Sequence, residues 1–516
     1  MLVSAAPLHP ERVRAVVIGA GVAGLATAIR LAAGGLQVTL LERHAHTGGK
    51  IRTLPSAAGP VDAGPTVLTM RHVFDDLFDC AGEKLEDHVT LIRQDILARH
   101  FWPDGSSLDL YADAGKSADA IADFAGARAA DDFRRFNNRT AQLFHAFDAP
   151  MMQAPAPRLT DLVPHVLRQP ALIRAMAPLS TLKSALARQF SDPRLAQLFG
   201  RYATYVGGAP HLSPAILSLI WQAEAAGVWV VEGGMHRLAG ALTKLARAQG
   251  VEIVTEAHVA RIGLTGGRAS SVHLENGTSL AADAVVYAGD PRALATGSLG
   301  ADLTHIAPQT LKLPRSFSAR VHSFAAVSAG RDLAHHNVFF AADPQSEFTD
   351  LAAGRIPADP TLYLCAEDRG QQTQPPAMER FEIISNAPAA SDTSDPTDLD
   401  QWHHQIIHRL TSSGVTFSPT PDTTTITTPQ TFARMFPDSL GALYGQTPHG
   451  MTAALKRPTA RTPVPGLWLA GGGTHPGAGV PMATLSARHA AGAILRDLTL
   501  TSTSHPTVMP GGMSTA

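Results

Sequence analysis

A glycine-rich turn near the N-terminus, followed by a distant acid, has the spacing needed to bind the ADP half of a dinucleotide. The run Val16–Gly24 is a hydrophobic strand pattern that ends in glycines at positions 19, 21 and 24. In such a turn Gly19 permits the tight bend, Gly21 lets the backbone approach a pyrophosphate, and Gly24 allows close helix–strand packing. Glu42 follows 21 residues after Gly21, where a carboxylate accepts ribose hydroxyls. A glycine turn in another kind of α/β unit is the alternative.

Two further segments could extend this site. Gly48-Gly49-Lys50 offers backbone donors and one cation, and a plain surface turn is the alternative. Asp62-Ala-Gly-Pro-Thr66 predicts a strand end followed by a turn that Pro65 presets. Thr66 either points its hydroxyl into a site or caps the helix expected over 72–80.

A second strand–glycine–helix pattern lies near the C-terminus. Val464–Ala470 predicts a buried strand, Gly471–Gly479 a glycine-rich turn, and 481–496 a helix. The N-terminus of that helix could stabilise negative charge. A late segment of this kind can close over a flavin ring, so FAD fits better than a freely exchanging nicotinamide.

Other chemistries lack their residues. His404 and His408 have the spacing of a helical metal pair, but no acidic partner completes a site, and the adjacent His335 and His336 lack ligand spacing. Neither GxxxxGK[ST] nor GxSxG occurs. We therefore expect no metal, and a cofactor that carries the difficult step.

Composition sets the class of protein. The 516 residues exceed one ordinary core, and a net charge of −2 gives no basic footprint for nucleic acid. Two cysteines cannot build a disulfide framework, which favours a reducing compartment. No segment offers about 18 uninterrupted apolar residues, so we expect no membrane span. The sequence carries no signal for an oligomeric state.

The order of the patterns predicts an α/β, Rossmann-like dinucleotide-binding domain that is interrupted twice. A helical pattern runs from 117 to 147, and several short helices, separated at prolines 164, 170, 178 and 193, follow over 159–200. The expected units are 1–100, dinucleotide-binding; 101–230, a mainly helical insertion; 231–298, dinucleotide-binding; 299–455, a substrate domain with a mixed sheet; 456–497, dinucleotide-binding; and 498–516, a disordered tail.

The insertion contains a candidate membrane-associating region. Over 160–190 leucines and other apolar residues alternate with Arg168, Arg174, Lys183 and Arg188, and the only acid is Asp161. This pattern is typical of a helix in a membrane interface, and an ordinary core-facing helix is the equal alternative.

Taken together, these motifs resemble the bacterial phytoene desaturase family of FAD-dependent carotenoid desaturases. The likeness covers nearly the whole chain, and Thr474-His-Pro-Gly-Ala-Gly-Val-Pro481 is its most specific part. Phe101–Gly105, Tyr202–Gly208 and Thr474–Met482 are most similar to the members that act at C-3,4 of 1-hydroxy carotenoids. Lys50 stands where many members have Arg, which keeps the charge but loses the guanidinium fork. Gly472 lies where related amine oxidases carry Glu, which argues against an amine oxidase.

The resemblance implies an α/β flavoprotein of the GR2, amine-oxidase-like type, with an inserted α+β substrate domain. It implies FAD as cofactor, an acyclic 1-hydroxy or 1-methoxy carotenoid as substrate, and oxygen or a quinone as electron acceptor. It also implies peripheral association with the cytoplasmic side of the inner or intracytoplasmic membrane. The implied cofactor-binding residues are Gly19, Gly21, Val22, Ala23, Gly24, Glu42, Arg43, Gly49, Lys50, Thr66, Val259, Asp290, Gly472, Gly479, Val480, Pro481 and Met482.

The implied reaction is hydride transfer from an allylic carbon to the flavin, with loss of a proton from the neighbouring carbon. The polyene delocalises positive charge, so a strong base is not required. His475 and Asp438 are the candidates for one only because they are titratable residues in or near the motifs. The alternatives are a phytoene desaturase or a redox-neutral carotenoid isomerase of this family, an amine oxidase, and, from another class, a non-catalytic prenyl-lipid binding protein.

Overall fold

The computed structural model describes residues 13–389 and 399–503, with side chains up to 498. A five-stranded parallel sheet is assembled from the beginning, middle and end of the chain, in the order β20-β13-β1-β2-β9. Its strands are β1 (Arg14–Ile18), β2 (Gln37–Leu41), β9 (Glu252–Val254), β13 (Ala284–Tyr287) and β20 (Leu467–Leu469).

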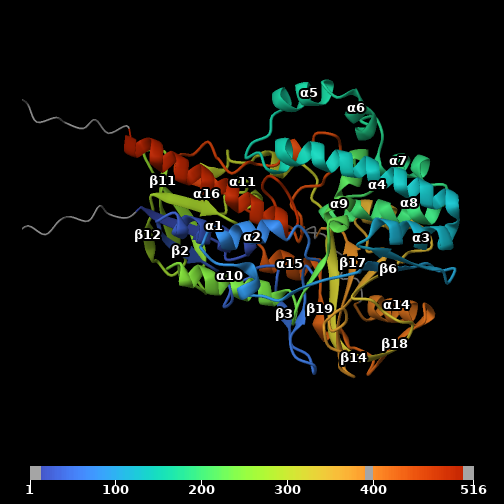
Figure 1. The fold of residues 1–516 in the computed structure, drawn as a ribbon. Helices are drawn as coiled ribbons and strands as arrows, with labels where there is room; N and C mark the ends of the chain where they lie inside the picture. The colour runs from blue at the N-terminus through green and yellow to red at the C-terminus, as the bar shows by residue number, and fades with distance from the viewer. Residues whose placement is uncertain (1–12, 390–398, 504–516) are drawn as a thin grey trace, which may run out of the picture.

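Both faces of this sheet are covered. One face packs under helices that share a core with Val17 and Leu40, and α16 lies along α1 (Figure 1). The other face, with Val16 and Leu41, packs against a three-stranded antiparallel sheet. Such double cover is what a parallel sheet of buried strands requires. The covering elements are α1 (Val22–Ala33), α2 (His72–Asp79), α10 (His236–Ala248), α16 (Val480–Thr503), β10 (Val259–Thr265), β11 (Arg268–Leu274) and β12 (Ser279–Ala281).

A larger, mainly antiparallel sheet forms the second half of the molecule. Its order is β18-β14-β17-β16-β15-β6-β7, with β19 paired to β14, and only β6 and β15 run parallel. Helix α14 (Leu399–Ser412) packs on one face through Trp402, Ile406 and Leu410. The strands are β6 (Ile96–Phe101), β7 (Ser107–Tyr111), β14 (Ser318–Gly330), β15 (His336–Phe339), β16 (Leu362–Ala366), β17 (Glu379–Ala387), β18 (Val415–Ser418) and β19 (Ile426–Thr427). Short pairs join β3 (Thr53–Leu54) to β4 (Val61–Asp62) and β5 (Leu91–Arg93) to β8 (Trp229–Val231).

Helices from the middle of the chain stand beside this sheet around an aromatic core. Phe133, Phe136, Phe199, Tyr202 and Trp221 are fully buried together there. The helices around this core are α3 (Ala114–Ala125), α4 (Ala127–Phe147), α7 (Leu182–Gln189), α8 (Pro193–Gly200) and α9 (Trp221–Ala225). Helices α5 (Leu159–Leu167) and α6 (Pro170–Met176) pack instead in a separate cluster with Leu143 and Phe147 of α4. Four others lie elsewhere: α11 (Arg292–Ala295), α12 (Gln309–Lys312), α13 (Pro344–Ala352) and α15 (Pro429–Met435).

The structure corrects two local predictions. The helix expected over 117–147 is two helices, because Gly126 takes φ +88° and ends α3 before α4 begins. The break expected at Pro164 is wrong, since α5 continues past it and Arg168 N donates to the Pro164 carbonyl at 3.1 Å.

Some of the predicted unit boundaries fall inside observed elements. The boundary at 100/101 falls inside β6, so the helical insertion begins only after β7. Helix α16 extends to Thr503, and the remainder of the predicted tail, 504–516, lies outside the described residues. Within the described ranges no helix is both long enough and apolar enough to cross a bilayer.

Candidate active site

Two glycine turns meet at the carboxyl end of β1. Gly19 adopts φ +100°, and a Cβ on Gly24 would lie 1.8 Å from the Gly19 carbonyl oxygen. The backbone of Gly48 bridges that of Gly21, and a Cβ on Gly49 would lie 3.0 Å from the Gly21 Cα. The two turns therefore form a surface of exposed backbone at the N-terminus of α1, which suits a pyrophosphate.

Glu42 stands at the end of β2 beside this surface. Its side chain is 5% exposed, and its two oxygens accept the N–H groups of Ala20 at 2.8 Å and His44 at 2.9 Å. These bonds fix the carboxylate and leave further lone pairs for a ligand hydroxyl.

The turns open into a cavity of about 1460 Å³ that runs between the two sheets and the helical region. This volume exceeds the ~300–1,000 Å³ of ordinary ligand sites, so it has room for two large ligands. Most of the predicted cofactor residues line it, namely Gly19, Gly21, Val22, Ala23, Glu42, Arg43, Gly49, Lys50, Thr66, Val259, Asp290, Gly472, Gly479, Val480, Pro481 and Met482. Gly24 does not line it and instead packs against the Gly19 turn.

The two candidate bases are placed differently. His475 does not line the cavity; its Nε2 lies 2.8 Å from the Ala154 carbonyl oxygen, and burial lowers its pKa. Asp438 lines the cavity, but it accepts from Thr296 Oγ1 at 2.9 Å and lies 3.8 Å from Arg292 Nη1. His475 therefore lies outside the cavity lining, whereas Asp438 stays in it with one carboxylate oxygen already hydrogen-bonded.

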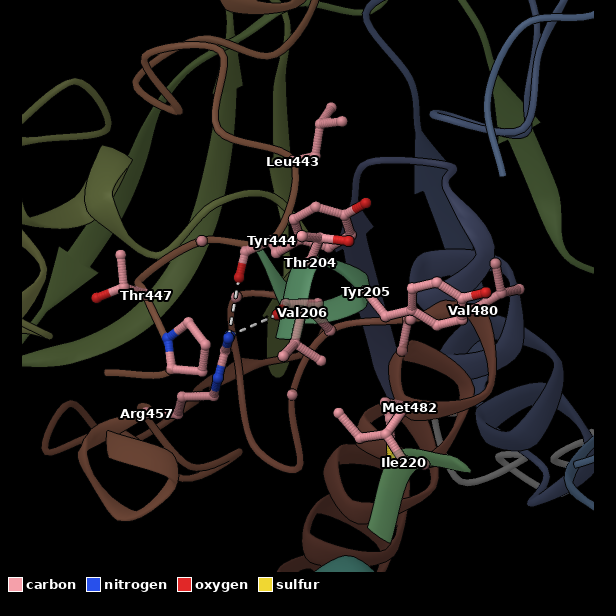
Figure 2. Close-up of a pocket in the computed structure, with 18 of the residues that line it drawn as sticks. Thr204, Tyr205, Val206, Ile220, Leu443, Tyr444, Thr447, Arg457, Val480 and Met482 are labelled. Carbon is pink, nitrogen blue, oxygen red and sulfur yellow. Dashed lines mark hydrogen bonds between the residues drawn. The ribbon is translucent and has the colours of Figure 1, made fainter. Parts of the chain in front are cut away.

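Cations gather where the cavity leaves the glycine turns. Lys50 Nζ donates to the Leu443 carbonyl at 2.6 Å, and burial lowers its pKa to about 8 although Asp290 opposes this effect. Asp290 itself is paired with Arg315. Arg457 Nη1 donates to the Gly472 carbonyl at 2.8 Å, and burial lowers its pKa to about 10. Figure 2 shows its side chain pointing towards Tyr444, whose carbonyl accepts from Nη2 at 3.0 Å.

Sequence reasoning missed Arg315, Tyr444 and Arg457. These three residues lie outside any glycine motif. Their position in the cavity depends on the path by which the chain folds back to the five-stranded sheet, which no local pattern predicts. The only available signal was the nearby Gly471–Gly479 turn, to which Arg457 is bonded.

The late glycine turn brings the end of the chain to the same cavity. Gly471 and Gly479 have φ of +121° and +108°, and Gly471 N donates to Ser486 Oγ at 2.7 Å. The first turn of α16, from Val480 to Ala483, then lines the cavity. The N-terminal and C-terminal segments thus bound one site.

Polar residues also occur on the wall farther from the turns. Thr66 Oγ1 lies 2.7 Å from the Tyr363 hydroxyl, which lies 2.6 Å from His336 Nδ1. Arg201 lies over the ring of Tyr205, which also lines the cavity, and the fully buried Tyr202 behind them donates to the cavity-lining Glu224 at 2.6 Å. Burial raises the pKa of Tyr202, Tyr205 and Tyr363 well above the usual value, so these hydroxyls stay protonated.

A histidine–cysteine cluster lies behind this wall. Pairing of β15 with β16 sets Cys365 opposite His336, and potential ligand atoms of His335, His336 and Cys365 lie within 4.8 Å of one another. Ligand spacing along the sequence does not reveal this cluster, because Cys365 is distant in the chain from the two histidines. His335 is already bonded on both ring nitrogens, to Cys365 Sγ at 3.4 Å and the Arg369 carbonyl at 2.7 Å. Burial lowers its pKa to about 4, so the ring is neutral.

Helices α5 and α6 form the apolar mouth of the cavity. Seven apolar side chains of these helices line it, namely Leu159, Leu162, Val163, Val166, Leu167, Ile173 and Met176. Three of these lining side chains are also exposed to solvent, as is Leu179 after α6, and Figure 1 shows α5 and α6 projecting from the rest of the molecule. The exposed fractions are 54% for Leu159, 48% for Val163, 64% for Leu167 and 101% for Leu179.

Comparisons with known proteins agree with this geometry. The model of the family of flavin-containing amine oxidoreductases matches residues 22–330. Hydroxyneurosporene desaturase of Cereibacter sphaeroides is 55% identical, covering 94% of this chain and 98% of that protein. The same enzyme of Rhodobacter capsulatus is 50% identical over 93% and 97%, and 4,4'-diaponeurosporene oxygenase of Staphylococcus aureus is 30% identical over 92% and 97%.

Solved structures share the fold at low identity. Cyclohexylamine oxidase from Brevibacterium oxydans IH-35A matches with a TM-score of 0.57 and 16% identity, over 95% of this chain and 100% of that one. Putrescine oxidase matches with a TM-score of 0.59 and 13% identity, over 94% and 99%.

FAD is the cofactor, and the backbone surface at Gly19, Gly21 and Gly49, which side chains at these positions would obstruct, fits its pyrophosphate. The sequence identity to the desaturases extends over nearly their full length, and it places the chain in a narrower group than the shared fold does. The chain belongs to the flavin-containing amine oxidoreductases and, within them, to the carotenoid desaturases.

Proposed function

We propose that this desaturase introduces the C-3,4 double bond into an acyclic carotenoid that carries a 1-hydroxy or 1-methoxy group. One observation supports this most: a single cavity joins the glycine turns to a long apolar lining. The relatives named hydroxyneurosporene desaturase are 55%, 50% and 42% identical to this chain, which favours their substrate class.

Desaturation removes two hydrogens from neighbouring carbons, one as hydride and one as a proton. FAD supplies the hydride acceptor when it is bound. The two electrons and both hydrogens would then reduce oxygen to hydrogen peroxide or a quinone to a quinol, which completes the balance. The residues of the chain hold the polyene against the ring and exclude water from the site.

The first turn of α16 has a role in this arrangement. Val480–Ala483 line the cavity, so the N-terminal end of the helix faces it. The positive end of the helix dipole there stabilises negative charge that develops on a ligand. Of the two candidate proton acceptors, Asp438 lines the cavity and His475 does not, so Asp438 is the one that could take up the released proton.

We propose further that the substrate enters from a membrane surface through the mouth formed by α5 and α6. The exposed apolar side chains of Leu159, Val163, Leu167 and Leu179 would enter the interface, and the exposed Arg168 would meet its head groups. The inner side chains of the same helices would then receive a polyene that never crosses water. The cytoplasmic side of the inner or intracytoplasmic membrane is the surface we infer.

The test is product analysis with the FAD-loaded enzyme on liposomes that contain 1-hydroxyneurosporene, 1-methoxyneurosporene or phytoene. We expect loss of two mass units and a red-shifted spectrum with the first two, because the conjugated system lengthens. Conversion of phytoene alone would assign an earlier desaturation step. A product of unchanged mass would indicate an isomerase, and either result would contradict the proposal.

A further inference from the structure

One part of the mostly apolar cavity wall is charged. Arg201, Tyr205 and Glu224, which we call the polar patch, all line the cavity. The Tyr205 hydroxyl interacts with both Glu224 and Arg201, and the Arg201 guanidinium carbon lies 4.9 Å from the Tyr205 ring centroid. Tyr202, behind the patch, donates to Glu224 at 2.6 Å. A purely apolar ligand would gain nothing from these groups.

The patch is deeply buried and incompletely satisfied. Glu224 is 4% exposed, and among the residues that the structure describes Arg201 Nε and Nη2 have no hydrogen-bond partner. Burial by itself lowers the pKa of Arg201, but Tyr205 and Glu224 outweigh it and raise that pKa, so the guanidinium is charged. Buried charges and unmade hydrogen bonds destabilise a fold. A role in ligand binding therefore explains the polar patch better than a role in stabilising the fold.

The patch adjoins the segments expected to surround the flavin ring. Ala223, next to Glu224 in α9, packs in one cluster with Met70 and with Met482 in the first turn of α16. Figure 2 shows Tyr205 among the same pocket residues as Val480 and Met482. The patch therefore lies at the reacting end of the cavity.

We propose that the polar patch binds the oxygen at C-1 of the carotenoid, and so selects hydroxylated or methoxylated end groups. This inference rests on the proposed function. In such a substrate three bonds separate the oxygen from C-3, which is roughly 4 Å at bond lengths of ~1.5 Å. A subsite for that oxygen has to lie beside the redox centre, which is where the patch is.

The chemistry of the patch distinguishes three end groups. A hydroxyl donates to the Glu224 carboxylate and accepts from Arg201. A methoxy oxygen accepts from Arg201 but has no proton to donate to Glu224. A hydrocarbon end does neither and leaves the buried groups unpaired, and sites built to bond a hydroxyl reject analogues that lack it.

A second polar pair in the cavity is less suited to this task. Glu347 lines the wall with Asn386, but its two oxygens already accept from Asn386 Nδ2 at 2.9 Å and Thr361 N at 3.1 Å. Burial also raises the pKa of Glu347. The Glu347 pair is internally satisfied, whereas the polar patch is not.

The experiment compares Tyr205→Phe, Glu224→Gln and Arg201→Met in the FAD-loaded enzyme. Tyr111→Phe is the matched control, because it removes a hydroxyl from a tyrosine in β7 that is not among the residues lining the cavity. For each protein, kcat/KM and the Kd from quenching of tryptophan fluorescence are measured with 1-hydroxyneurosporene, its 1-methoxy ether and neurosporene. Thermal unfolding verifies that each variant is folded.

The wild type should prefer the hydroxylated carotenoid over neurosporene in both quantities. Tyr205→Phe should lower this preference about tenfold, the effect of about one hydrogen bond to a charged network. Glu224→Gln should weaken use of the hydroxyl and spare the ether, Arg201→Met should weaken use of both, and the control should stay within about twofold.

An unchanged preference in folded Tyr205→Phe and Glu224→Gln would overturn the inference. If the wild type desaturates none of the three carotenoids, the proposed function fails. The Kd values then still decide the binding subsite, because they require no turnover.

Discussion

At the nucleotide end of the cavity, the wall is backbone: Gly19, Gly21 and Gly49 leave main-chain groups bare, and Glu42 is held by two N–H groups. At the substrate end, the wall is side chain, supplied by α5, α6, α9 and strands of the larger sheet. A ligand that contacts backbone needs glycine at fixed places, so one substitution destroys the fit. A ligand that contacts apolar side chains needs only a cavity of sufficient volume, and many combinations of apolar residues can form one. The two ends should therefore respond differently to mutation.

The largest effect is expected at Gly24. A Cβ there would lie 1.8 Å from the Gly19 carbonyl oxygen, so Gly24→Ala must push α1 away from the turn. We expect FAD affinity to fall by about 100-fold or more, equivalent to ~3 kcal/mol of strain. The measurement is flavin retained per protein after dialysis and reconstitution.

The control for this change is Gly240→Ala in α10, where a Cβ would contact nothing within 4 Å. It should retain FAD and gain stability by about 0.5–1 kcal/mol. Equal FAD binding by both variants would show that the backbone of the first turn does not hold the nucleotide.

The mouth of the cavity should respond next most strongly, and through membrane binding only. Leu167→Glu with Leu179→Glu removes two exposed apolar side chains, each worth about 1.5–3 kcal/mol when buried. Partition onto anionic vesicles should fall about 30-fold or more, while FAD binding stays as in the wild type. Flotation assays give the first quantity and flavin absorbance the second.

Leu311→Glu with Val327→Glu is the matched pair, since these side chains are 49% and 43% exposed away from α5 and α6. If this pair loses vesicle binding to the same extent, the mouth is not the membrane contact.

Lys50 should give a smaller effect that depends on pH. Burial lowers its pKa to about 8 in the folded protein, against 10.5 ordinarily. An anionic cofactor favours the protonated form, so binding takes up a proton above pH 8 and affinity weakens as pH rises. The FAD Kd should increase up to about tenfold per pH unit above 8.

The same shift affects stability in the opposite direction. Between pH 8 and 10.5 the unfolded chain binds the Lys50 proton and the folded chain does not, so this group makes the FAD-free protein more stable as pH rises. Lys50→Arg keeps the charge throughout and should flatten both profiles. A wild-type Kd that is independent of pH up to 10 would rule out contact between Lys50 and the cofactor.

The contrast also explains what the sequence could predict. Gly19, Glu42 and Gly479 line the cavity as expected, because turns with positive φ and close backbone contacts restrict the residue types. Arg201 and Glu224 could not be found, since their pairing depends on packing of helices that are separate in sequence. Two predictions of local structure were also wrong, because packing of the helices overrides the local pattern. Gly126 divides a continuous helical pattern into two helices, and Pro164 does not end α5.

The account requires that one cavity hold the flavin and the polyene in direct contact. The most direct test is anaerobic mixing of the FAD-loaded enzyme with 1-hydroxyneurosporene, with the flavin and carotenoid bands followed together. We predict that the oxidised flavin bands disappear with one flavin reduced for each new conjugated double bond, in a single phase. A red-shifted carotenoid without flavin reduction, or a flavin that stays oxidised with no new product, would contradict it.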